Sequence, residues 1–370
     1  MRRDAGEVIL PQRNAKTAKR IQSAFFLCSL RSFAANRLRF LFWRILRGSR
    51  LSCLFLLFLP FGGLAQSKTD ISHGVKLIER VVETGVADQP ELQLILRLPP
   101  GHTPEAPTAK GVLAFCTWQG EADSLRSRLA NDSDGLVRYA RKHGLALLTW
   151  NTATLWKTGK SYNQIGRREQ QGLRDDFDKV ARAWKSGVGK LCREQGLPQD
   201  GFLLYGISRG AHWSGRLALR APEMFLAVHI HVANSYDKPS PSGALPLWLV
   251  SSGDLDVGRN NALAFYRECR AKGFPMILKV VNGLGHSDHP EVSALRTAFF
   301  DYALGLKDEA ASAQATPGQL MLAGLASGQL TGDVLSQEVY RGAEAAKIPE
   351  NQRVALPEEG LARVWGFLRK

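Results

Sequence analysis

A serine between two glycines is the first feature of this sequence that could do chemistry. Ser208 lies at the centre of the segment 206–210 (GISRG), which follows the apolar segment 201–205 and opens a segment of helical character. Glycines on both sides of a serine allow a strained turn that holds the hydroxyl above the end of a strand. A serine hydroxyl is a weak nucleophile at neutral pH, so the site also needs a base and a group that orients the base.

Carboxylate and imidazole side chains follow two later strand-like segments. Asp254 and Asp256 come after the first of these segments, and His286 and His289 come after the second. Loops at the carboxyl ends of parallel strands leave the sheet at one edge, where ligand chemistry takes place. The chain order serine, acid, histidine is the order expected for a serine on such a turn.

Two carboxylates compete for the role of the orienting acid. We prefer Asp256 over Asp254 because Asp256 lies farther from the strand, on a turn that contains Gly253, and can therefore reach the histidine. Asp254 would then cap or support the loop. The expected partner of the histidine is Asp256.

Two histidines compete for the role of the base. We prefer His286 because Gly283 and Gly285 allow its loop to come close to the serine. His289 directly precedes Pro290 at an expected helix start, which favours a capping role. The expected catalytic set is therefore Ser208 as nucleophile, His286 as base and the preferred carboxylate as its partner.

Alternating strand and helix patterns surround these residues. An antiparallel strand pair is expected at the start, followed by nearly continuous apolar strands that suit burial on both faces. Such alternation predicts an α/β protein with a mostly parallel, doubly wound sheet and helices on both faces. The expected strands are 75–82, 91–98, 111–118, 145–150, 201–205, 227–232, 247–251 and 276–281, and the expected helices are 134–143, 173–194, 210–220, 260–272 and 290–304.

The chain is expected to fall into four parts. Residues 1–65 form a leader, 66–84 a polar linker and the first strand, 85–306 the α/β domain and 307–370 a C-terminal extension. The extension opens with an Ala-, Gly- and Gln-rich stretch that breaks the rhythm of strand and helix. A strand over 334–340 and a helix that opens at 356–359 are expected within it.

The basic charge is concentrated in the leader. Twelve Lys or Arg and two acidic residues fall in residues 1–65, which therefore hold +10 of the net charge of +15. The remaining charge is ordinary for a protein surface, which argues against a nucleic-acid groove. The apolar run 51–65 follows basic residues and ends in small ones, as in a secretory signal, and predicts a secreted or periplasmic protein. An organellar transit peptide is the alternative.

Other candidate ligands are weak. His229 and His231 lie on one face of a strand, but two ligands without a third are too few for a metal site, so hydrogen-bonded core histidines are expected. Cys116, Cys192 and Cys269 follow the leader without a C-x-x-C pair, which argues against a zinc knuckle or a disulfide scaffold.

The segment 206–210 and the loops with Asp256 and His286 resemble those of the α/β-hydrolase family, over about residues 85–306. The resemblance implies an oxyanion hole from the amide of Arg209 and a second amide near Thr117 or Trp118, and no metal or organic cofactor. The connection 233–246 is too short for a helical cap, so an open pocket is expected. With such an open pocket the chain resembles secreted esterases of the feruloyl, acetylxylan and polyhydroxyalkanoate depolymerase kind, or the dienelactone hydrolases.

The expected function is that of an exported serine hydrolase of carboxylic esters. Its substrate would be a small-molecule or polymer-linked ester, attacked to form an acyl-enzyme. A peptidase of the prolyl-oligopeptidase kind is one alternative, although the sequence offers no room for a propeller domain. A catalytically silent α/β-hydrolase-like binding module, with the C-terminal extension as the contact, is the other.

Overall fold

The computed structural model describes residues 68–72, 75–86, 89–117, 122–131, 135–151, 167–240, 243 and 245–369. The leader 1–65, with its apolar run, and Trp118 lie outside the described residues. Residues 64–370 form one compact unit.

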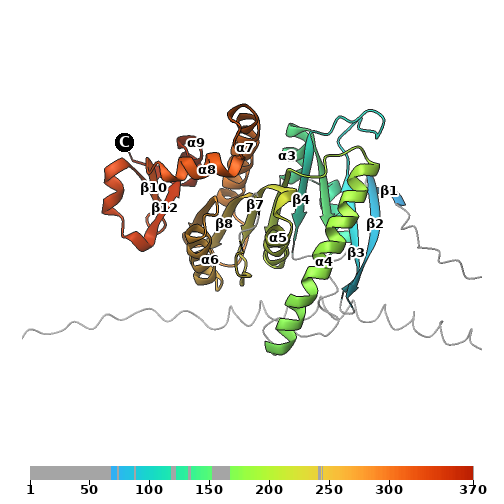
Figure 1. Ribbon diagram of the computed structural model, residues 1–370, viewed down its shortest axis with the longest axis horizontal. Helices are drawn as coiled ribbons and strands as arrows, with labels where there is room; N and C mark the ends of the chain where they lie inside the picture. Colours follow the sequence, from blue (N-terminus) through green and yellow to red (C-terminus); the bar gives the residue numbers. More distant parts are fainter. Residues whose placement is uncertain are drawn as a thin grey trace, which may run out of the picture. The chain divides into compact units, whose positions relative to one another are not determined.

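A central sheet of nine strands organises this unit (Figure 1). Its order is β1-β2-β3-β5-β4-β6-β7-β8-β9. Pairs are antiparallel from β1 to β5 and parallel from β5 to β9, which confirms the expected mostly parallel sheet. The strands are β1 (Lys68–Ser72), β2 (Val75–Val86), β3 (Gln89–Arg97), β4 (Gly111–Cys116), β5 (Leu145–Trp150), β6 (Phe202–Ile207), β7 (Phe225–His231), β8 (Leu247–Gly253) and β9 (Met276–Val281).

Burial explains why the central strands are apolar along their whole length. Every residue of β4, β5, β7, β8 and β9 is buried. Strands covered on both faces lose the alternation of polar and apolar residues that half-exposed strands show. The nearly continuous apolar segments of the sequence are therefore the interior of the sheet.

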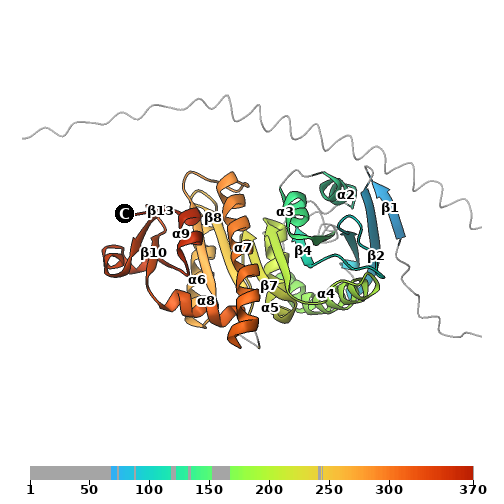
Figure 2. The same ribbon diagram turned by 90° about the horizontal axis from the view of Figure 1, so that it is seen from above.

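Helices cover both faces of the sheet, as expected (Figure 2). Arg296 of α7 lies over the ring of Tyr205, whereas Gly215 of α5 lies against Ile230. Tyr205 pairs with His229, so Ile230 points to the opposite face. One face carries α2 (Ala122–Ala130), α3 (Leu136–His143) and α7 (Pro290–Ala313), and the other carries α4 (Arg167–Glu194), α5 (Arg209–Arg220) and α6 (Arg259–Ala271).

Some element boundaries differ from the expected ones. Helix α7 continues nine residues beyond Leu304, because the Ala-rich sequence there contains good helix formers, and Leu306 and Ala310 are buried. The helix ends at Ala313, and the backbone of the next residue, Gln314, is left-handed. The expected linker contains strand β1, which pairs with β2. Composition does not predict these segments correctly, because it does not show the partner that a segment packs against.

The C-terminal extension forms a second sheet of four strands in the order β12-β10-β11-β13. The expected strand 334–340 is wrong over its first half, because Asp333 accepts hydrogen bonds from the amide of Leu335 (2.9 Å) and the hydroxyl of Ser336 (3.0 Å) and so makes a turn. The elements of the extension are α8 (Pro317–Ala326), β10 (Leu330–Asp333), β11 (Glu338–Arg341), β12 (Arg353–Leu356), α9 (Glu359–Trp365) and β13 (Phe367–Leu368), with short 3-10 helices at Gly342–Lys347 and Glu350–Gln352. A further 3-10 helix, Pro222–Met224, lies between α5 and β7.

A buried lysine joins the second sheet to the edge of the first. Lys279 of β9 is fully buried, donates hydrogen bonds to the side chain of Gln337 and the carbonyl of Trp365, and pairs with Glu291. The indole of Trp365 donates in return to the carbonyl of Leu278 at 2.7 Å. The extension is therefore held to β9 by polar contacts inside an apolar interface.

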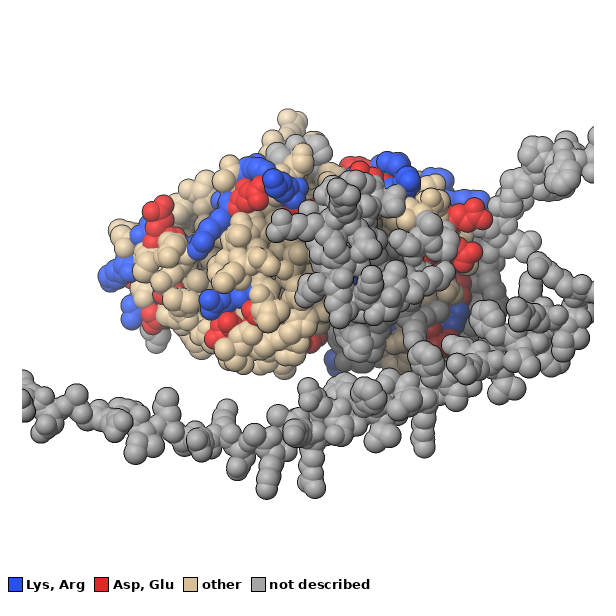
Figure 3. All heavy atoms as spheres, turned by 90° about the horizontal axis from the view of Figure 1, so that it is seen from below, with Lys and Arg blue, Asp and Glu red and all other residues tan. Residues whose placement is uncertain are grey.

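Basic and acidic side chains are interspersed over the described surface drawn in Figure 3. Exposed ion pairs such as Lys272 with Glu268 and Lys185 with Glu223 join side chains of opposite charge. Among the described residues, the helices are too short or too polar to cross a bilayer.

Candidate active site

A sharp turn between β6 and α5 presents Ser208. Strand β6 ends at Ile207 and α5 begins at Arg209, so a single residue makes the turn. Its backbone has φ 56° and ψ −120°, a conformation that is costly for any residue other than glycine. The amide of Ser208 donates to the carbonyl of His231 at 2.9 Å, which holds the turn against the neighbouring strand.

Both glycines around the serine are required by space. A Cβ on Gly206 would lie 2.5 Å from the carbonyl oxygen of Gly210 and 2.8 Å from the Cα of Ala211. A Cβ on Gly210 would lie 2.0 Å from the carbonyl oxygen of Cys116. Any larger residue at either position would push α5 away from β6 or β4, so the glycines allow the close approach that the turn needs.

The structure brings Ser208, His286 and Asp256 into one hydrogen-bonded line. The Oγ of Ser208 lies 2.8 Å from Nε2 of His286, and Nδ1 of His286 lies 2.9 Å from Oδ1 of Asp256. The second carboxylate oxygen of Asp256 accepts a hydrogen bond from the hydroxyl of Ser252 at 3.0 Å. The Asp256 side chain is fully buried, whereas that of His286 is 37% exposed. A substrate can therefore approach the imidazole and the serine, while the carboxylate stays shielded.

The competing residues occupy other places. His289 caps α7, where its Nδ1 accepts a hydrogen bond from the amide of Glu291 at 3.3 Å. Asp254 is held through its backbone, with its amide donating to Val281 at 3.0 Å. Asp256 and His286, rather than these neighbours, lie in the hydrogen-bonded line with Ser208.

Backbone contacts hold the loop after β8, which carries Asp256, against the loop after β9, which carries His286. The amide of Leu255 donates to the carbonyl of Leu284 at 3.0 Å. Gly253 lies so close to Leu284 that a Cβ at this position would come within 1.9 Å of the same carbonyl oxygen. These contacts fix the distance between Asp256 and His286.

The arrangement allows His286 to take the hydroxyl proton of Ser208. The Asp256 carboxylate accepts the Nδ1–H of His286, which leaves the lone pair on Nε2 directed at Ser208. An imidazole held in this tautomer can take the serine proton as the hydroxyl attacks a carbonyl.

Candidates for stabilising a developing oxyanion meet at the start of α5. Arg209 is the first residue of the helix, and first-turn amides point toward the N-terminal end, where the helix dipole is positive. The amide nitrogen of Thr117, at the end of β4, lies 2.7 Å from the position that a Cβ on Gly210 would take. Trp118, the other candidate donor, lies outside the described residues. Burial lowers the pKa of the Arg209 guanidinium.

Three further histidines make hydrogen bonds whose partners the sequence does not predict. His212 of α5 accepts hydrogen bonds at Nε2 from the amides of Asn234 (2.8 Å) and Ser235 (3.1 Å), so it holds the loop after β7. His229 and His231 are buried and both contact Ser251, which confirms the expected core role. No pattern in the sequence predicts these contacts, because the residues that they join lie 20 to 23 positions apart in the chain.

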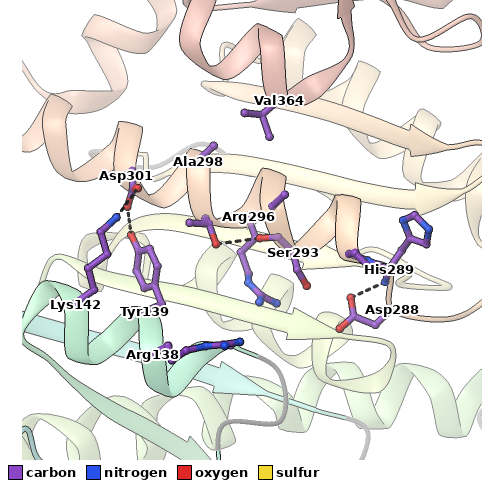
Figure 4. A pocket seen from close by; sticks show the side chains of 14 residues that line it. Arg138, Tyr139, Lys142, Asp288, His289, Ser293, Arg296, Ala298, Asp301 and Val364 are labelled. Atoms are coloured by element: carbon purple, nitrogen blue, oxygen red, sulfur yellow. Dashed lines mark hydrogen bonds and ion pairs between the residues drawn. The ribbon is translucent and has the colours of Figure 1, made fainter.

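A pocket of about 960 Å³ lies between α3 and α7, beside the loop that carries His286 (Figure 4). Asp288 and His289 line one end of the pocket. Asp301 receives hydrogen bonds there from the hydroxyl of Tyr139 at 2.9 Å and the ammonium of Lys142 at 3.5 Å. The lining residues do not include Ser208, so this pocket is a neighbour of the site and not its centre.

Metal and disulfide chemistry have no support in the part of the chain that the structure describes. It contains no cluster of three or more His, Cys, Asp or Glu side chains that could hold an ion. Cys116, Cys192 and Cys269 are buried and none forms a disulfide.

Comparison with known proteins gives low similarity to esterases. No family model matches the chain, and no curated protein matches it. Among solved structures, esterase PE8 is 16% identical, with a TM-score of 0.42 and coverage of 56% of this chain and 98% of that one. A thermostable esterase from Pseudomonas putida is 15% identical (TM-score 0.41, 62% and 82% covered), and S-formylglutathione hydrolase from Staphylococcus aureus is 12% identical (0.39, 62% and 97%). Because these TM-scores are low, the similarity assigns neither a family nor a substrate to the chain.

Proposed function

We propose that this protein is a serine hydrolase of the α/β-hydrolase type that cleaves carboxylic esters through an acyl-enzyme. The observation that carries the proposal is the line from Ser208 through His286 to the buried Asp256, with spacings of 2.8 and 2.9 Å. A nucleophile on a strained strand-to-helix turn, followed in the chain by acid and then histidine, is the arrangement of that family.

The reaction proceeds in two halves. Ser208 Oγ attacks the ester carbonyl while His286 Nε2 takes the hydroxyl proton, and the imidazolium that forms is stabilised by Asp256. His286 then returns the proton to the leaving alcohol, and an acyl group remains on the serine. Water repeats the attack with His286 again as the base, which releases the acid and restores the serine.

The oxyanion of each tetrahedral intermediate would be held at the start of α5. The amide of Arg209 is the first proposed donor, and an amide at the end of β4, of Thr117 or Trp118, is the second. A preorganised donor of this kind contributes about 10²–10³ in kcat. The positive end of the α5 dipole adds to the same field.

The substrate is proposed to be a bulky ester, of the polymer-linked or carbohydrate kind. In the described part of the connection after β7, residues 233–240, the chain forms no helix that could cover Ser208. The exposed edge of His286 is in keeping with an open site. An ester panel with acetyl, feruloyl, glucuronoyl and hydroxyalkanoate groups would rank these substrates by kcat/KM.

The decisive experiment is active-site labelling with a fluorophosphonate probe, combined with hydrolysis of short-chain nitrophenyl esters. The wild-type chain should label at Ser208 and hydrolyse the esters, and Ser208→Ala should do neither. Ser127→Ala, on helix α2 against β3 and β5, is the matched control and should retain both. An unlabelled, folded wild-type chain would instead support a silent binding module, and full activity of Ser208→Ala would refute the assignment of the nucleophile.

Export is proposed from the leader alone. The apolar run 51–65 with its basic flank would direct secretion, and cleavage after Ala65 would leave Gln66 at the new N-terminus. Amino-terminal sequencing of the protein from the extracellular or periplasmic fraction tests this. A chain that stays in the cytoplasm with its leader intact would contradict it.

A further inference from the structure

A chain of buried hydrogen bonds runs behind the proposed active site, from β7 through β8 to the loop of the base. Ser251 Oγ lies 2.7 Å from Nε2 of His229 and 2.9 Å from Nδ1 of His231. His231 Nε2 lies 2.9 Å from the carbonyl oxygen of Ser287, the residue after His286. His229, His231 and Ser251 have no exposed surface.

The direction of every hydrogen bond in this chain follows from its last member. A carbonyl oxygen only accepts, so His231 must donate its Nε2–H to Ser287. Burial lowers the pKa values of both His231 and His229, so each ring is neutral and carries one proton. Nδ1 of His231 then accepts from the Ser251 hydroxyl, whose oxygen in turn accepts the Nε2–H of His229.

The same histidine also contacts the nucleophile through its backbone. The carbonyl of His231 accepts the amide hydrogen of Ser208 at 2.9 Å. One residue of β7 thus touches the serine turn through its main chain and the base loop through its side chain. The ring contact lies one residue beyond His286, at a turn where the amide of Ser287 also donates to Gly285 at 3.1 Å.

The base loop is therefore held on both sides of His286. On one side the carbonyl of Leu284 accepts from the amide of Leu255, and on the other the carbonyl of Ser287 accepts from His231. Without the second contact, the His286 peptide could rotate out of line while Asp256 still held the ring. A displacement of about 1 Å at a catalytic group can cost about 10²-fold in rate.

We propose that His231 is a positioning residue, whose Nε2–H holds the Ser287 carbonyl and thereby keeps His286 in line between Asp256 and Ser208. This inference rests on the proposed function and deepens it. His231 touches neither the substrate nor the reacting atoms. Its tautomer is set by the Ser287 carbonyl, and Ser251 donates to the opposite ring nitrogen, so Ser251 and His229 support the same contact from behind.

Two substitutions of similar chemistry separate positioning from packing. The amide nitrogen of a glutamine reaches the position of the imidazole Nε2, whereas that of an asparagine reaches only the position of Nδ1. His231→Gln should keep the hydrogen bond to Ser287 and a kcat close to that of the wild type. His231→Asn should lower kcat by about 10²-fold, the cost of a misplaced base, with little change in KM.

A remote histidine provides the matched control. His102 is buried, its Nε2 donates to the carbonyl of Gln195 at 2.7 Å, and its Nδ1 accepts from the amides of Thr108 and Ala109. These contacts lie before β4, at the opposite edge of the sheet. His102→Asn should lower the melting temperature and leave kcat unchanged.

Nuclear magnetic resonance of the ¹⁵N-histidine-labelled chain tests the proposal without relying on activity. His231 should carry its proton on Nε2, and the low-field Nδ1–H signal of His286 should persist in His231→Gln and be lost or broadened in His231→Asn. A His231 protonated on Nδ1 would refute the proposal, even if every variant unfolded. Equal kcat values for the two variants in an active wild-type background would also refute it, whereas an inactive, unlabelled wild-type chain would refute the proposed function instead.

Discussion

Gly253 and Leu284 lie in backbone contact, because the carbonyl oxygen of Leu284 is 1.9 Å from the position that a Cβ on residue 253 would occupy. This contact joins the loop of the proposed acid to the loop of the proposed base. The distance between Asp256 and His286 is therefore set by main-chain packing as well as by their own hydrogen bond.

Gly253→Ala should separate the two loops. The added methyl group must push the Leu284 carbonyl away, and a shift of about 1 Å between acid and base should reduce kcat by about 10²-fold. Esterase assays of the purified variant measure this. Gly305→Ala is the control, because a Cβ there meets nothing within 4 Å inside α7, and the helix should gain about 0.5–1 kcal/mol. Wild-type kcat in Gly253→Ala would show that the loop contact does not position the site.

Asp256→Asn should leave the geometry almost intact and still remove most of the activity. The amide can donate to Nδ1, which would place the proton of His286 on Nε2 and leave no lone pair for Ser208. A loss of about 10⁴-fold in kcat is the scale for this change of tautomer. Rates of fluorophosphonate labelling follow the same step.

Asp254→Asn is the matched control for the carboxylate. Its backbone, rather than its carboxylate, is bound in the loop, through the amide that donates to Val281. Its kcat should stay within about twofold of the wild type, as for a residue outside the proton path. A large loss in Asp254→Asn with a small one in Asp256→Asn would reverse the assignment of the acid.

Acid should destabilise the protein through buried histidines. Burial lowers the pKa of His212 to about 4, below the value of about 6.5 expected for an unfolded chain. Between these pH values the unfolded state binds a proton that the folded state does not, so the free energy of unfolding falls as the pH is lowered. One such group contributes at most about 1.4 kcal/mol per pH unit.

His212→Gln should reduce the pH dependence of the free energy of unfolding while keeping a hydrogen-bond acceptor at this position. The glutamine oxygen can accept the amides of Asn234 and Ser235 but takes up no proton in this range. Urea unfolding at several pH values between 4 and 7 should show a shallower slope in the variant by about one proton. If the free energy of unfolding depended on pH equally in the variant and the wild type, the lowered pKa of His212 would not be the cause of the acid sensitivity.

Lys279→Met should loosen the C-terminal extension. The variant leaves the Trp365 carbonyl and the Gln337 side chain without their buried hydrogen-bond donor. It also removes the ion-pair partner of Glu291. Removing one member of a buried polar cluster costs about 3–5 kcal/mol, which chemical denaturation can measure. Lys185→Met breaks an exposed pair with Glu223 and should cost less than about 1 kcal/mol. Similar losses for both would contradict the docking role of Lys279.

Local sequence alone determined much of this protein. Strands β2 to β9, helices α3 to α7, the serine turn and the loops after β8 and β9 were predicted because their signals are short-range: apolar runs, glycines at tight turns, and helix stops such as Gly144. Strand β1 and helix α2 were not predicted. The parallel order then required the loops with Asp256 and His286 to leave at the same edge as Ser208. Each of these signals depends on the backbone conformation of a few consecutive residues, so the local sequence is enough to predict it.

Only the tertiary structure decided which side chains meet. Packing of the two loops on each other places Asp256 within hydrogen-bond distance of His286. His289 instead caps α7, and neither outcome can be read from local sequence. The link from His231 to Ser287 and the second sheet of the extension left no trace in spacing or composition. Such contacts join residues far apart in the chain, and their free energy depends on three-dimensional packing that no local pattern encodes.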